Sequence, residues 1–272
     1  MPVQVQFMAE WEKSGIPGML SVVVPAHNEE GCIRATLEGL VHALQQAEIN
    51  HEILVINDNS KDLTEQILME MSLRHPTIRY LNNPPPNGFG FAIRQGLVAF
   101  RGEAVALFMA DSSDSPQDLV KFYRKLQEGY DCVFGNRFSA GGLVVDYPWN
   151  KLILNRLGNI MIRFLLRTGY SDATNAFKMY RRSVIAGIQP ILSYQFNITI
   201  ELPLKAIIRG FSFAVVPNSW FNRQEGLSKF KIREMGSRYL FIVLYCLIEK
   251  IFMKGQFSSD TLKQGQIQHW PR

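Results

Sequence analysis

The sequence predicts an α/β fold: a mostly parallel sheet with helices on both faces and a further helix at the C-terminus. Short apolar segments alternate with amphipathic segments between residues 19 and 136. The connections between them are short, which places successive strands parallel in one sheet with helices packed on both faces. Polar clusters follow the strands, and such sheets bind ligands beyond the carboxyl ends of their strands.

The first two strand–helix units are predicted by apolar periodicity. Residues 20–24 are a valine-rich apolar run, typical of a buried parallel strand. A helix is expected over residues 33–44, because apolar residues there recur every three or four positions. The second strand is expected over residues 53–56, and Asp62 is expected to cap a helix over residues 63–73.

Three more strands are expected before residue 136. They are residues 78–81, followed by a helix over 91–100; residues 104–109, followed by a helix over 116–128; and residues 132–134. The helix after the fourth strand has a clear start signal, since Ser115 can act as N-cap and Pro116 suits the first helical position.

The second half of the sequence is less regular. Its expected elements are helices over 149–166, 198–209 and 232–253, and strands over 177–180 and 213–216. No repeat or linker is evident. We therefore expect one main domain over residues 19–231, with an N-terminal tail over 1–18, a C-terminal amphipathic or interfacial helix over 232–256 and a polar tail over 257–272.

Composition excludes several classes of protein. The chain has 272 residues, 47% of them apolar, which is enough for a sizeable core and excludes a disordered protein. A net charge of +5 is too small for a dedicated nucleic-acid binder and fits an anionic small ligand or a membrane surface. The three cysteines are widely spaced, so a reducing cytosol is the expected compartment. No signal peptide and no transmembrane helix are predicted.

Candidate functional residues follow the predicted strands. Asp111 and Asp114 lie three residues apart, and two such carboxylates can share a divalent cation that holds a diphosphate. Alternatively, Asp111 satisfies loop amides and Asp114 a helix N-terminus. The chain has neither a glycine fingerprint for dinucleotides nor a Walker lysine motif, so a bound diphosphate must be neutralised by metal and basic side chains. The other candidates at strand ends are Pro25, His27, Glu29, Asp58 and Arg137.

Four motifs together resemble the family 2 inverting glycosyltransferases, in the subgroup that includes dolichol-phosphate mannose synthase and bacterial polyprenyl-phosphate glycosyltransferases. They are VVVPAHNE at 22–29, NDNSKDLT at 57–64, MADSSDSPQDL at 109–119 and RQEGLSKF at 223–230. The resemblance implies a GT-A fold with a Rossmann-like sheet, a nucleotide-sugar donor carrying GDP or UDP, and Mg²⁺ or Mn²⁺.

The resemblance also implies roles for particular residues. Pro25, His27 and Glu29 correspond to the nucleoside-binding loop, Asp58 to the base or ribose contact, Asp111 and Asp114 to the metal loop, Asp172 to the segment beside the sugar, and Arg223 and Lys229 to a loop that closes over the phosphates. The usual D-x-D spacing of the family would place acids at Ala110 and Ser112. Asp111 is therefore displaced by one residue, while Asp114 occupies a family ligand position.

The acceptor is expected to be a dolichyl or undecaprenyl phosphate, which is already anionic and needs cations rather than a base. Arg137, Lys151 and Arg156 are candidates for those cations. A glycan hydroxyl in surface polysaccharide or lipopolysaccharide synthesis would need a base. Glu201 is the candidate base; alternatively, Glu201 is an acid on the surface of a helix. A non-catalytic nucleotide-sugar binder is a third interpretation.

Residues 239–248 are almost continuously apolar and have basic neighbours on both sides. This pattern predicts a C-terminal helix that docks on a membrane surface without spanning it, and hence a peripheral protein at the cytoplasmic face. Alternatively, the helix packs on the core or on a second copy in a homo-oligomer.

Overall fold

The computed structural model describes residues 11, 14–222 and 232–252, except for the side chains of 232–235. Its centre is a seven-stranded sheet in the order β3-β2-β1-β4-β7-β5-β8. The strands are β1 (Ile16–Ala26), β2 (His51–Asn57), β3 (Ile78–Asn82), β4 (Gly102–Leu107), β5 (Cys132–Asn136), β7 (Lys178–Arg181) and β8 (Phe213–Pro217). Two short strands, β6 (Leu143–Val145) and β9 (Ser219–Phe221), form a separate parallel pair.

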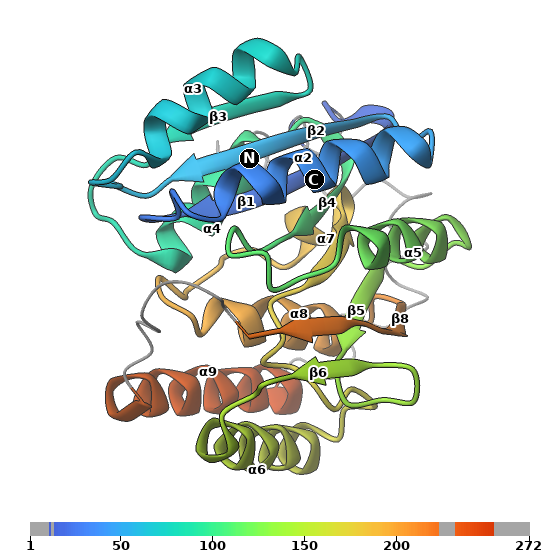
Figure 1. Ribbon diagram of the computed structural model, residues 1–272. Coiled ribbons are helices and arrows are strands. Elements are labelled where there is room, and N and C mark those ends of the chain that lie inside the picture. The colour runs from blue at the N-terminus through green and yellow to red at the C-terminus, as the bar shows by residue number, and fades with distance from the viewer. Residues whose placement is uncertain (1–10, 12–13, 223–231, 253–272) are drawn as a thin grey trace.

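Helices cover both faces of the sheet (Figure 1). They are α2 (Ile33–Gln46), α3 (Thr64–Arg74), α4 (Phe89–Ala99), α5 (Pro116–Gln127), α6 (Trp149–Leu166), α7 (Arg182–Gly187), α8 (Ile198–Ile208) and α9 (Ile232–Phe252). The predicted α/β class is confirmed, including the C-terminal helix.

Strand β1 shows how the sequence produces two cores. Successive side chains of a strand point to opposite faces. Val22 and Val24 join the apolar cluster that contains residues of α2, α3 and α5, whereas Val23 joins the cluster that contains residues of α4, α6, α8 and α9. All three valines are fully buried, which explains why this strand reads as a continuous apolar run.

One strand runs against the others. β7 lies antiparallel between β4 and β5, so these two parallel strands are not neighbours. The predicted mostly parallel sheet is confirmed, and the direction of this one strand was left open by the sequence. Periodicity could not supply that direction, because side chains alternate between the two faces of a strand in the same way whichever way the strand runs.

Several predicted boundaries shift by a few residues, as at β1 and α3. β1 starts at Ile16 rather than at residue 20, and a register irregularity between Ile16 and Leu20 separates the added residues from the regular pairing. Helix α3 starts at Thr64, and Asp62 Oδ1 accepts a hydrogen bond from the Thr64 amide at 3.0 Å. The Asp62 carboxylate thus accepts a hydrogen bond from a backbone amide at the start of the helix. Asp62 itself lies one residue before the N-cap position, which Leu63 occupies.

Helices α6 and α9 lie together at one end of the molecule, away from β2 and β3 (Figure 1). A buried ion pair between Arg209 Nε and Glu249 Oε1, at 2.6 Å, ties α9 to the end of α8. The Lys250 amine donates to the carbonyl of Leu166, which joins α9 to the C-terminus of α6. Within the ranges given above, no helix is both long and apolar enough to cross a membrane.

Candidate active site

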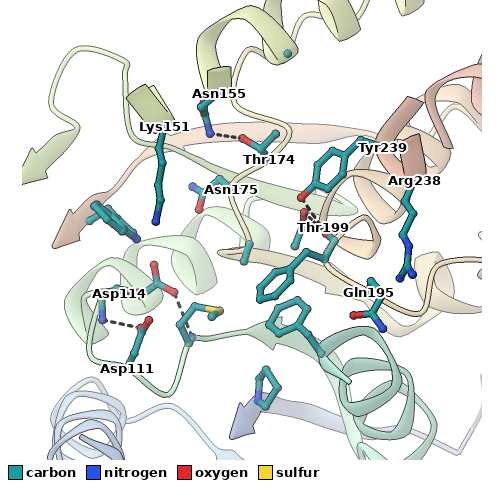
Figure 2. Close-up of a pocket in the computed structure, with 18 of the residues that line it drawn as sticks. Asp111, Asp114, Lys151, Asn155, Thr174, Asn175, Gln195, Thr199, Arg238 and Tyr239 are labelled. Atoms are coloured by element: carbon teal, nitrogen blue, oxygen red, sulfur yellow. Dashed lines mark hydrogen bonds between the residues drawn. The ribbon is translucent and has the colours of Figure 1, made fainter. Parts of the chain in front are cut away.

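A cavity of about 880 Å³ lies at the carboxyl ends of β1, β2 and β4. One side is formed by the loops after these strands; we call it the strand-end wall, and it includes Pro25, His27, Glu29, Asp58, Asp111, Ser113 and Asp114. The opposite side is formed by α6 and α9; we call it the helical wall, and it includes Lys151, Leu154, Asn155, Gly158, Met161, Ile162, Arg238, Tyr239, Leu240 and Val243. Figure 2 shows side chains of both walls around the cavity.

The loop after β4 directs two acids toward the cavity. Ser112 has a left-handed backbone with φ of 58°, and its hydroxyl lies 2.7 Å from the Thr36 hydroxyl. Asp111 Oδ1 accepts a hydrogen bond from the Ser113 amide at 3.1 Å, and Asp114 Oδ2 accepts one from the Met109 amide at 3.2 Å. Asp111 and Asp114 line the cavity on either side of this turn (Figure 2).

The two acids are electrostatically coupled. Asp114 is only 4% exposed. Burial, followed by the negative charge of Asp111, raises the pKa of the Asp114 carboxyl to about 7. The positive charge of a divalent cation would offset both the burial of Asp114 and the repulsion from Asp111. The two carboxylates are therefore suited to bind such a cation. Among the described residues, no group of three or more His, Cys, Asp or Glu side chains could hold a metal alone. The remaining ligands would then be diphosphate oxygens and water, as is common for Mg²⁺.

Asp58 joins the loop after β2 to the loop after β3. Its Oδ1 accepts hydrogen bonds from Asn83 Nδ2 at 2.8 Å and Asn87 Nδ2 at 3.2 Å, and its Oδ2 accepts one from the Gly88 amide at 2.9 Å. Its backbone carbonyl lies 2.6 Å from His27 Nδ1. The residues expected around a nucleoside are therefore brought together, with Asp58 at the centre of their hydrogen bonds.

Arg137 is fixed by a buried partner. Its Nε and Nη2 donate to Asp172 Oδ2 and Oδ1 at 2.9 and 2.7 Å. Burial lowers the pKa of the Arg137 guanidinium, but the Asp172 carboxylate more than offsets this and raises that pKa above its ordinary value. Arg137 lines the cavity, whereas Asp172 is fully buried behind it. Asp172 thus acts on the cavity through Arg137 rather than by facing it.

Helix α6 carries a polar stripe of which the sequence analysis identified only Lys151. The Nδ2 atoms of Asn155 and Asn159 donate to Thr174 Oγ1 at 2.8 and 3.0 Å, and Asn159 Oδ1 accepts from the Thr174 amide at 3.4 Å. Lys151, Asn155 and Asn159 are spaced four residues apart, so they share one face of the helix. That spacing in an otherwise apolar helix was a visible signal.

Of the other candidates for acceptor chemistry, Lys151 lines the cavity, whereas Arg156 and Glu201 do not. Lys151 lines the cavity and extends from α6 toward the side of Asp114 in Figure 2. The guanidinium of Arg156 instead lies over the ring of Phe138, 4.7 Å from its centre. Glu201 is fully buried, pairs with Lys205 at 2.7 Å and accepts from the Leu192 and Ser193 amides at 2.7 Å each. It is therefore neither a base facing the cavity nor a helix-surface acid. Arg223 and Lys229 lie outside the described residues.

Aromatic side chains close the cavity between the two walls. Phe89 stacks on Phe196 with ring centres 4.2 Å apart, and both rings line the cavity. The Tyr239 hydroxyl donates to the Phe196 carbonyl at 3.3 Å, which links α9 to the segment before α8. These contacts join residues distant in the sequence, and no local pattern predicted them.

The structure combines an acidic loop at the carboxyl ends of parallel strands with one antiparallel strand in the sheet, and this fold matches glycosyltransferase structures of the GT-A class. The family model described as glycosyl transferase family 2 matches residues 21–188. The chain belongs to this family and is a glycosyltransferase. The resemblance found in the sequence is thereby confirmed.

Known relatives agree with this assignment. The chain is 31% identical to polyprenol monophosphomannose synthase of Mycolicibacterium smegmatis, over 80% of this chain and 86% of that protein. Its fold resembles glucosyl-3-phosphoglycerate synthase of Mycobacterium tuberculosis in complex with UDP (TM-score 0.65, 18% identity, 88% of this chain and 84% of that one). A structure of the same synthase with Mn²⁺, UDP-glucose and phosphoglyceric acid gives a TM-score of 0.66 at 17% identity, covering 88% and 83%.

Proposed function

We propose that this glycosyltransferase transfers a sugar from a GDP- or UDP-sugar to a polyprenyl phosphate, with Mg²⁺ or Mn²⁺ bound at the acidic loop. The observation that carries the proposal is the distribution of carboxylates in the cavity. Those that line it, Glu29, Asp58, Asp111 and Asp114, all lie on the strand-end wall. The described residues of the helical wall contribute amines, amides and apolar groups but no carboxylate. A hydroxyl acceptor needs a base there, whereas a phosphate does not.

On the donor side, Asp111 and Asp114 would hold the metal. Its positive charge would stabilise the nucleoside diphosphate as it leaves. Pro25, His27 and Glu29 lie beside them and would surround the nucleoside. Asp58 would keep the two loops around the nucleoside in place through its contacts with Asn83, Asn87 and Gly88. The structures of the synthase with Mn²⁺ and UDP-glucose support a metal-dependent donor site.

On the acceptor side, Arg137 and Lys151 would bind the phosphate. A phosphate oxygen forms a bond to the anomeric carbon while the bond from that carbon to the diphosphate oxygen breaks, with inversion at the carbon. Asp172 holds Arg137 in a fixed orientation, so the guanidinium need not reorganise as charge moves. Arg223 and Lys229, implied by the family resemblance, would add cations over the diphosphate. The name of the mycobacterial relative supports this class of acceptor.

We also propose that the reaction takes place at the cytoplasmic face of a membrane, with the protein bound peripherally. A polyprenyl phosphate is anchored in a bilayer by its hydrocarbon chain. The wide spacing of the three cysteines, with no C-x-x-C pair, supports a reducing compartment.

The test is a transfer assay with the full chain. A panel of radiolabelled GDP- and UDP-sugars is incubated with Mg²⁺ or Mn²⁺ and one of three acceptors: a short-chain polyprenyl phosphate, the matching polyprenol or a soluble glycan. Label should enter organic solvent only with the phosphate, and a chelator should abolish transfer. Transfer to the glycan or to the polyprenol would refute the phosphate acceptor, and donor binding without any transfer would indicate a non-catalytic binder.

A further inference from the structure

Helix α6 presents an apolar stripe to solvent. Trp149 and Phe164, at the two ends of the helix, are 75% and 80% exposed. Between them, Ile153, Leu157 and Ile160 are also exposed, and their spacing of three and four residues places all five on one face. The opposite face carries Lys151, Asn155 and Asn159. The helix therefore separates the cavity from an apolar surface that no residue in the described part of the chain covers.

Helix α9 has a second exposed apolar stripe. Phe241, Leu244 and Ile248 are exposed, and Phe252 is 82% exposed. The buried face of the same helix, which includes Val243 and Cys246, packs into the core. Scattered exposed apolar residues are normal on a soluble protein, but two neighbouring helices with continuous stripes are not.

The two stripes meet the cavity. α6 and α9 are neighbours at the same end of the molecule (Figure 1), joined by the bond from the Lys250 amine to the Leu166 carbonyl. Leu154 and Met161 of α6 and Leu240 of α9 are exposed and also line the cavity. The apolar surface is thus continuous with the rim of the helical wall.

The charged side chains around these apolar stripes are mainly positive. α6 contains Lys151, Arg156 and Arg163 but no acid, and Arg167 follows it. In the part of α9 whose side chains are described, the one acid, Glu249, is buried against Arg209 at 2.6 Å. The nearest acid along the chain before α6 is Asp146, in the preceding loop. A second copy would bring like charges together without acids to compensate them, whereas an anionic lipid surface would attract them.

We propose that the outer stripes of α6 and α9 form one docking surface for an anionic lipid bilayer, with Leu154, Met161 and Leu240 at the boundary where the cavity opens to lipid. This extends the membrane site from the C-terminal helix to α6, which supplies the larger share of the exposed stripe and its exposed cations. The entry of a lipid acceptor across this boundary rests on the proposed function; the docking surface itself does not.

The test measures co-sedimentation of the full chain with vesicles of phosphatidylcholine alone or of equal parts phosphatidylcholine and phosphatidylglycerol, without donor or acceptor. The wild type should bind the anionic vesicles. The double variant Ile160→Ser, Phe164→Ser should lose roughly ten-fold or more of this partitioning. Arg163→Glu, which reverses one charge, should lose roughly 5- to 25-fold on anionic vesicles only.

Matched controls come from exposed positions on other helices. Leu73→Ser, Val98→Ser removes two exposed apolar side chains from α3 and α4, and Arg124→Glu reverses an exposed charge on α5. These controls should bind vesicles like the wild type. Equal binding by α6 variants and wild type would overturn the proposal, as would a wild type that ignores both vesicle types. A dimer in light scattering that the Ile160, Phe164 double variant dissociates would assign the surface to a second copy instead.

A transfer assay with a detergent-dispersed short-chain acceptor separates this proposal from the proposed function. If the α6 variants retain transfer but lose vesicle binding, docking and chemistry are independent, as we expect. If the wild type binds vesicles but transfers to no polyprenyl phosphate, the docking surface stands and the proposed acceptor fails.

Discussion

The two walls of the cavity are built in different ways. The strand-end wall consists of loops fixed by buried strands, and three of its acids, Asp58, Asp111 and Asp114, are each held by backbone amides or neighbouring amide side chains. The helical wall consists of two helices whose inner faces touch the cavity and whose outer faces are apolar and exposed. The first wall is suited to hold charge rigidly, and the second to meet a flexible, partly apolar substrate. Under the function that we propose, donor chemistry would belong to the strand-end wall and acceptor access to the helical wall.

Removing an acid from the strand-end wall should have the largest effect. Asp114→Asn keeps an acceptor for the Met109 amide but removes the charge that a metal needs. We expect kcat to fall by roughly 10³-fold with the fold retained, because charge stabilisation of the leaving group is lost. Initial rates and circular dichroism test this. Glu128→Gln, at an exposed acid after α5, is the control. Activity within a few-fold of wild type would assign Asp114 a purely structural role.

The ion pair behind the cavity should matter most for stability. Asp172→Asn leaves the buried Arg137 guanidinium without its counter-charge, and we expect a loss of about 3 kcal/mol in the free energy of unfolding. Urea denaturation measures it. Glu103→Gln, which removes the partner of Arg181 in a surface pair, should cost about 1 kcal/mol or less. If both variants lost the same small amount, the buried pair would not be what fixes Arg137.

The coupled acids predict a pH dependence for metal binding. With the Asp114 pKa raised to about 7, the metal-free carboxyl is protonated below that pH, and binding must release its proton. Mn²⁺ affinity should therefore fall by about ten-fold per pH unit as the pH drops from 7 to 5, and level off above 7. Calorimetric titration in two buffers of different protonation enthalpy reports the released proton. The Asp114→Asn variant should show weak binding and lose this pH dependence.

The smallest effect is expected for the contact between α6 and the segment that contains Asp172 and Thr174. Asn159→Ala removes two hydrogen bonds to Thr174 and loosens the segment that carries Asp172, so kcat should fall by about five- to ten-fold with little change in the KM of the donor. Steady-state kinetics with both substrates varied would show this split. Asn150→Ala, at an exposed position of the same helix, should be neutral. An effect confined to the KM of the donor would contradict this division of the two walls.

The sequence by itself determined most of the strand-end wall. Val22, Val23 and Val24 fix a buried strand through their composition, and the polar residues after each strand reach the ligand edge because parallel strands end at the same side of a sheet. The family motifs then identified Asp111 and Asp114 as a pair, and the structure brings both to the cavity. These features are local, so the order of residues is enough to predict them.

Only the tertiary structure decided the direction of β7, the pairing of Arg137 with Asp172 and the two faces of α6. Each depends on contacts between residues distant in the chain: β7 inserts between strands that precede it, and Asp172 lies 35 residues from its partner. The apolar stripe of α6 can be found in the sequence from its periodicity. That periodicity identifies a helix face, but it does not say whether a core, a second copy or a lipid surface covers the face. What covers a face depends on packing, which the order of residues does not encode locally.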